Sequence, residues 1–190
     1  MYQQQNFQNN HGYQTQQQQP PAHAGFAFPL DEDSAEKAGA QTFLAETGAY
    51  NVTITSAQYV RAQTGTHGVK LRLETADGLQ GSVILNYMKA NNEPIFGANF
   101  LNAILYLAGL GGFSWHNAMD EKGQMVQMAK ELHGVNIGLV LEAVPNQNKE
   151  GTHLEVRQVF QPQSRITAGE ARQGLKPEAV AKLLKRLGVE

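Results

Sequence analysis

The feature that most constrains the fold is a repeated change in the spacing of apolar residues. Tyr50, Val52 and Ile54 alternate with polar residues, which is typical of a β-strand with one face on a core. Further along the chain the apolar spacing becomes helical, with a period near 3.6, and then returns to strand-like runs. The predicted order is three strands, a helix and two strands, over residues 48–59, 69–75, 79–87, 95–108, 135–144 and 152–160.

This order of elements predicts a mainly β fold with helices. The specific fold expected is the five-stranded Greek-key OB-fold barrel, in which a helix between strands 3 and 4 covers one end of the barrel. After Ser56 the apolar phase shifts to Ala57 and Tyr59, which predicts a β-bulge. Asp77-Gly78 is a strong hairpin signal between the second and third strands. A β-sandwich is the alternative architecture.

The remaining segments of the folded region are assigned from local spacing. Residues 110–123 are loop-like and hold the only tryptophan, Trp115, and residues 124–132 are predicted to form a short second helix. An amphipathic helix is predicted near the C-terminus, followed by Gly188 as a stop. This helix either covers the domain's own core or serves as a dimer or partner helix, so a homo-oligomer is one possible state.

The chain divides by composition into four predicted regions. Residues 1–25 are rich in Gln and Asn and are predicted to be a disordered arm. Residues 26–47 form an acidic lead-in with a few apolar anchors, suited to docking on the domain or to occupying a basic groove of this chain or of a partner. The OB-fold core is expected over residues 48–165, and a helical extension over residues 166–190.

The charges are unevenly distributed along a chain whose formal net charge is −2. Residues 1–47 contain 1 basic side chain (Lys or Arg) and 5 acidic ones (Asp or Glu), and residues 48–165 contain 9 of each kind. The residues after 165 contain 5 basic and 3 acidic side chains. A local basic stripe can still attract phosphate, because salt screens charges beyond about 8 to 10 Å.

Composition also bears on the compartment. The chain has no cysteine, so disulfides and thiol-based zinc sites are excluded. No apolar run approaches the roughly 20 residues needed to cross a bilayer, and the N-terminus lacks the layout of a secretory signal. We therefore expect a cytoplasmic protein that is not embedded in a membrane.

A positively charged sheet face is the main candidate site. Lys70 and Arg72 alternate with Val69, Leu71 and Leu73 and are predicted to lie on the outer face. In an OB-fold the outer face of strands 2 and 3, with the loops after strands 1 and 4, forms the binding groove. The alternative is a solvated strand face on which these cations pair with carboxylates. Further candidate cations on this surface are Arg61, His67, Lys89, Lys149 and Arg157.

Aromatic side chains complete the candidate site, since unpaired bases stack on aromatic faces. The candidates are Tyr59, Tyr87 and Trp115. Tyr59 lies past the predicted bulge and is expected to be exposed. Tyr87 is assigned either to the core or to the binding face, and Trp115 is expected either to cap the core or to stack on a base.

Four stretches of sequence resemble a bacteriophage family that has been catalogued as uncharacterised: AFPLDEDSAEKAG, GAYNVTI, VKLRLETADGLQGSVI and ILYLAGLGG, in that order. The resemblance covers roughly residues 26–165. It implies a single-stranded-DNA-binding protein with an OB-type core, acting with replication or recombination proteins in the cytoplasm of a bacterial host. The Gln-rich arm is not part of the family's pattern.

No catalytic motif competes with this interpretation. The six histidines show no H-E-x-x-H spacing, and the glycines of GLGG follow the predicted helix, whereas a dinucleotide-binding loop would follow a strand. We therefore expect a protein that coats single-stranded DNA with little base preference, uses no cofactor or metal and is not an enzyme. The alternative is an OB-like interaction module that recruits proteins through the acidic segment or the C-terminal helix.

Overall fold

The computed structural model describes residues 42–120, 122–147 and 150–189, all within one compact unit, Gln41–Glu190. The Gln-rich arm predicted over residues 1–25, and the acidic lead-in as far as residue 41, lie outside the described residues.

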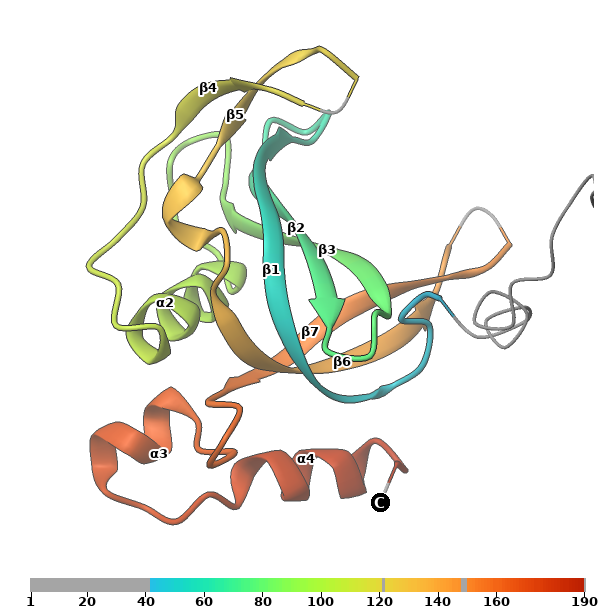
Figure 1. The fold of residues 1–190 in the computed structure, drawn as a ribbon, viewed down its shortest axis with the longest axis vertical. Coiled ribbons are helices and arrows are strands. Elements are labelled where there is room, and N and C mark those ends of the chain that lie inside the picture. Colours follow the sequence, from blue (N-terminus) through green and yellow to red (C-terminus); the bar gives the residue numbers. More distant parts are fainter. Residues whose placement is uncertain (1–41, 121, 148–149, 190) are drawn as a thin grey trace, which may run out of the picture. The chain divides into compact units, whose positions relative to one another are not determined.

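The described part of the chain is mainly β, built around one antiparallel sheet, as predicted (Figure 1). Its five long strands are β1 (Gly48–Arg61), β2 (His67–Thr75), β3 (Gln80–Met88), β6 (Asn136–Pro145) and β7 (Thr152–Phe160). β1 pairs with β2 and with β6, β3 pairs with β2, and β7 pairs with β6. These five strands correspond to the five predicted strands.

Two further strands correct part of the sequence-based assignment of residues 110–132, of which Lys130–Leu132 do form a short 3-10 helix. β4 (His116–Met119) and β5 (Met125–Met128) form a hairpin, where a loop and a short helix were predicted. The Asp120 carboxylate accepts hydrogen bonds from the backbone N–H groups of Lys122 and Gln124, and Gly123 has a positive φ of 73°. This turn chemistry outweighs the three-residue spacing of the methionines, which resembled a helix.

The sheet has seven strands within the described residues and does not close into a barrel. β3 pairs only with β2, and β7 pairs only with β6, so no hydrogen-bonded ladder joins these two strands. The closed barrel of five strands that we predicted therefore differs from the sheet in both strand number and closure.

The predicted bulge in β1 is confirmed. The register between β1 and β2 shifts between Ile54 and Ser56. A bulge increases the local twist and bend of a strand. β1 accordingly pairs with β6 over Gly48 to Thr53 and with β2 from Val52 to its end, so it connects both halves of the sheet.

Helix α2 (Gly97–Leu107) follows β3 as predicted and buries Leu101 and Ile104 in the main core. Its first residue lies directly against β3: a Cβ at Gly97 would be 2.0 Å from the backbone oxygen of Asn86. Only glycine permits this close approach. The start of α2 is therefore held at the exposed edge of β3.

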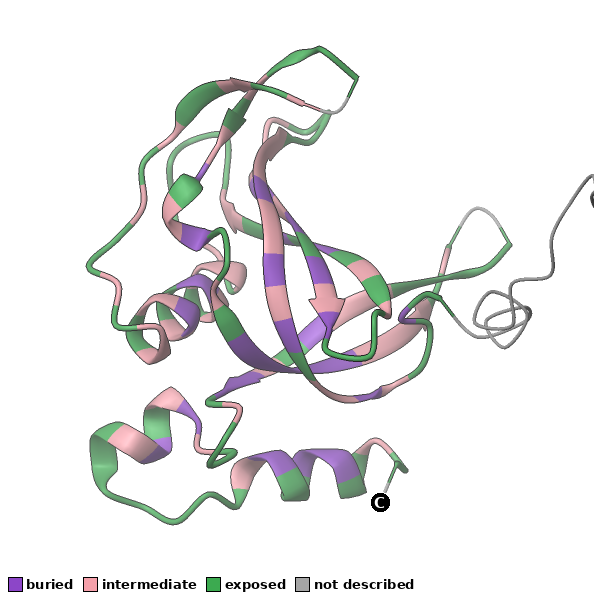
Figure 2. Ribbon diagram, in the orientation of Figure 1, coloured by how far each residue is buried: buried purple, intermediate pink, exposed green. Residues whose placement is uncertain are grey.

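The C-terminal residues form α3 (Ala168–Gln173) and α4 (Ala179–Arg186). A second apolar cluster joins Val180 and Leu184 of α4 to Val140 of β6 and Phe160 of β7. The purple segments of α4 in Figure 2 mark this buried stripe. The predicted amphipathic helix therefore covers its own domain.

Among the described residues, no helix has the length and apolar character needed to span a membrane.

Candidate nucleic-acid interface

A groove of about 670 Å³ lies beside the seam between β3 and β7, where the sheet is not closed. It is bounded by the end of β1, the outer faces of β2 and β3, the start of α2 and the first half of β7, all labelled in Figure 1. The lining residues that carry charge or exposed apolar surface include Arg61, Lys70, Ile84, Phe96, Glu155 and Arg157.

Two cations line the groove without an acidic partner among the described residues. Lys70 stands on the outer face of β2, opposite Gln58 of β1 and Ile84 of β3, while its neighbours Val69 and Leu71 are fully buried. Arg61 lies at the exposed end of β1. No carboxylate of the described residues forms an ion pair with either side chain. Within the described part of the chain, both charges are therefore open to a ligand in the groove.

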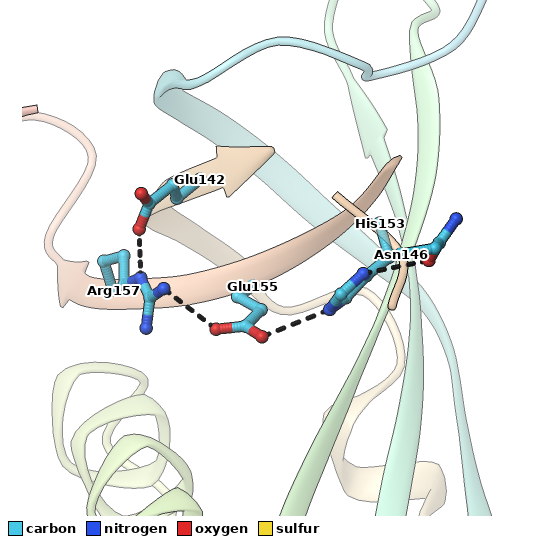
Figure 3. Close-up of polar contacts among 5 residues, drawn as sticks. All are labelled: Glu142, Asn146, His153, Glu155 and Arg157. Carbon is cyan, nitrogen blue, oxygen red and sulfur yellow. Dashed lines mark hydrogen bonds and ion pairs between the residues drawn. The ribbon is translucent and has the colours of Figure 1, made fainter. Parts of the chain in front are cut away.

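The third cation of the groove is neutralised by neighbouring acids. Glu142 of β6 and Glu155 of β7 are directly opposite each other in the strand register, where two carboxylates repel. Arg157 bridges them: its Nε pairs with Glu142, and one of its terminal nitrogens lies 3.0 Å from Glu155 (Figure 3). The other Glu155 oxygen is 3.1 Å from His153, whose second ring nitrogen contacts Asn146.

Three of the other predicted cations, Arg72, Lys89 and His67, do not line this groove. Arg72 is exposed on the same face of β2 as Lys70 but is not a lining residue. Lys89 forms an ion pair of 3.0 Å with Glu93, and this hydrogen bond holds the pKa of Glu93 below its ordinary value. His67 accepts or donates a 2.6 Å hydrogen bond with the Tyr59 hydroxyl. Lys149 lies outside the described residues.

The three predicted stacking aromatics come together, but in a cluster that packs on the core. Tyr59 meets Trp115 edge to face with ring centroids 5.4 Å apart, and Phe113 contacts Trp115 from a centroid distance of 5.1 Å. Tyr59 is half-buried rather than exposed as predicted, because it faces the same side as the core residue Val69 opposite it. Burial raises the pKa of Tyr87, while its hydrogen bond with Trp115 acts in the opposite direction.

The loop that carries Trp115 is held in place by Glu131. The Glu131 carboxylate accepts a 3.0 Å hydrogen bond from the Ser114 backbone N–H and lies 3.8 Å from the His116 ring. Trp115 lies between these two residues in the sequence and packs against the main core. Trp115 and Tyr87 were each given two possible roles in the sequence analysis. In the structure both side chains pack against the main core.

Sequence reasoning missed the exposed apolar part of the groove. Phe96 is 70% exposed and Ile84 is 55% exposed, and both line the groove beside Lys70. The helical spacing of Phe96 and Phe100 contributed only to the prediction of a helix over residues 95–108. Ile84 could have been predicted as an exposed residue, since alternation along β3 puts it on the face of the strand away from the buried Val83 and Leu85.

A scan against protein-family models finds no match to this chain, and a search of curated proteins finds no similar sequence. Within the described residues, no group of three or more His, Cys, Asp or Glu side chains is arranged to hold a metal ion.

Proposed function

We propose that this protein binds single-stranded DNA along the groove, with little base preference, as a coat rather than as an enzyme. The observation that carries the proposal is the pair of cations, Arg61 and Lys70, that line a groove of about 670 Å³ and have no acidic partner among the described residues. Contacts to phosphates are tolerant of sequence, so this groove suits a coat.

The finer fold is part of the same proposal: we infer that the sheet is an OB-type barrel opened between β3 and β7 and enlarged by the β4–β5 hairpin. Two observations support this inference. The order β1, β2, β3, α2, β6, β7 and the pairing of β1 with both β2 and β6 are those of the OB-fold. The groove also occupies the outer face of the second and third strands, where OB-folds bind nucleic acids.

The biological setting follows from the resemblance to phage proteins in the sequence. We propose that the chain acts in phage DNA replication or recombination, in the cytoplasm of the bacterial host, and contacts other proteins of those processes. The groove supports only the DNA-binding part of this proposal.

The test is a titration of the full chain with oligo-dT at several salt concentrations. For single strands, the logarithm of affinity falls with the logarithm of salt concentration by about 0.7 per phosphate neutralised. A double change, Arg61→Ala with Lys70→Ala, is expected to weaken binding and to reduce this slope by about 1.4.

The matched control is Lys185→Ala with Arg186→Ala, which removes two exposed cations from the last turn of α4. Affinity and salt slope are expected to stay unchanged in that variant, because neither residue lines the groove. Equal losses in the two double variants would mean that binding is diffuse and that the groove is not the site.

A further inference from the structure

The exposed apolar surface in the groove is concentrated at Phe96. This residue is 70% exposed although it is large and apolar, and it lies directly before α2. Ile84, which is 55% exposed on β3, lines the same groove. Exposed apolar residues gathered in one concave site mark a binding surface more often than scattered ones do.

The position of Phe96 is fixed by its neighbours. Gly97 permits the start of α2 to lie directly against the Asn86 backbone, which holds Phe96 at the edge of β3. The half-buried ring of Phe100 meets Phe96 edge to face, with centroids 5.0 Å apart and planes at 86°. An exposed ring that is held in one orientation loses little conformational entropy when a ligand stacks on it.

The charges beside Phe96 indicate the chemistry of that ligand. Arg61 and Lys70 line the same groove and have no acidic partner among the described residues, so the ligand is expected to carry negative charge next to a flat apolar group. A nucleotide of a single strand has this combination of phosphate and unpaired base. A duplex does not, because its bases are already stacked on one another.

We propose that Phe96 is the base-stacking residue of the groove, a role for which Tyr59, Tyr87 and Trp115 were the candidates in the sequence. This inference rests on the proposed function, since it names the part of the DNA that one subsite receives. The base lies against Phe96 and Ile84, and the phosphates lie toward Arg61 and Lys70.

The experiment compares two ligands of equal length, oligo-dT and an abasic deoxyribose-phosphate strand, with the full chain and its Phe96→Ala variant. Stacking of one base is worth a factor of about 5 to 150 in affinity. Phe96→Ala is expected to lose that factor on oligo-dT and to bind the abasic strand as the unaltered chain does. Tyr106→Ala is the matched control, because Tyr106, which lies on α2, is also an exposed aromatic residue but does not line the groove.

A second variant gives a direct optical signal. Phe96→Trp places an indole in the groove, and its fluorescence is expected to be quenched by oligo-dT and not by the abasic strand, beyond any change in Trp115. Equal oligo-dT affinity in Phe96→Ala and the unaltered chain would overturn the stacking role and leave DNA binding intact. Failure of the unaltered chain to bind oligo-dT at all would overturn the proposed function, and the stacking role with it.

Discussion

Glu155 at the groove and Glu170 at the junction of α3 and α4 are carboxylates in opposite settings. The Glu155 side chain is 40% exposed, and its two oxygens contact Arg157 and His153. Glu170 is 8% exposed, and its two oxygens accept four hydrogen bonds of 2.7 to 2.9 Å. An exposed ion pair contributes little to stability, whereas a buried carboxylate with all its donors in place is costly to remove.

The comparison shows how this domain separates binding from stability. The donors to Glu170 are the backbone and hydroxyl of Thr167 and the backbone N–H groups of Glu178 and Ala179, so one carboxylate joins the start of α3 to the start of α4. Glu155 instead lines the groove, where it pairs with Arg157 at 3.0 Å. We therefore expect changes at Glu170 to affect folding and changes at Glu155 to affect ligand affinity.

The largest expected effect is that of Glu170→Ala, which leaves four donors without an acceptor. We expect it to lower the free energy of unfolding by about 3 kcal/mol, on the scale of hydrogen bonds to charged groups. Urea denaturation of the two chains measures this difference. Glu178→Gln is the control, since it changes an exposed carboxylate whose ion pair with Lys182 contributes less than about 1 kcal/mol. Equal destabilisation by both variants would contradict the special role of Glu170.

The same carboxylate makes stability depend on pH. Burial alone would raise the pKa of Glu170, but the hydrogen bonds from Thr167, Ala179 and Glu178 outweigh it, and the pKa lies below its ordinary value. A depressed pKa in the folded state means that the stabilisation is complete above the unfolded value of about 4.3 and is lost as pH falls through the folded value. Urea midpoints between pH 6 and roughly pH 3 are expected to fall more steeply for the unaltered chain than for Glu170→Gln. Parallel curves would contradict this assignment.

A smaller effect is expected at the groove. Glu155→Gln keeps the shape of the side chain and removes one negative charge close to Arg157. We expect oligo-dT affinity to rise about two- to fivefold at low salt, and this gain to disappear at high salt, as screening of a surface charge requires. The measurement is the same titration at two salt concentrations. Glu178→Gln again serves as the control, and an unchanged affinity in Glu155→Gln would mean that the β7 wall does not face the ligand.

Much of the fold could be predicted from local patterns. Alternation along β2 correctly assigned Val69 and Leu71 to the core and Lys70 to the outer face, and the phase shift after Ser56 located the bulge. The β4–β5 hairpin was missed because Met125 and Met128 have the spacing of a helix. The hairpin forms because the Asp120 carboxylate accepts hydrogen bonds from backbone N–H groups in the turn between the two strands.

The candidate site could be predicted only in part. Arg157 was correctly placed on the last strand, but its neutralisation depends on Glu142, which is brought opposite Glu155 by the register of β6 and β7. Phe96 fell within the helix predicted over residues 95–108, and no role in the site was assigned to it. In the structure Phe96 is 70% exposed, directly before the point at which Gly97 lies against the Asn86 backbone of β3.

The amino-acid sequence by itself determined which sides of β2 and β3 face water, because alternation is a local property of neighbouring residues. Only the tertiary structure decided which of the exposed charges remain unpaired and which aromatic rings stay accessible. Both depend on distances between strands and helices far apart along the chain, and those distances are set by register, by the bulge in β1 and by the close contact at Gly97.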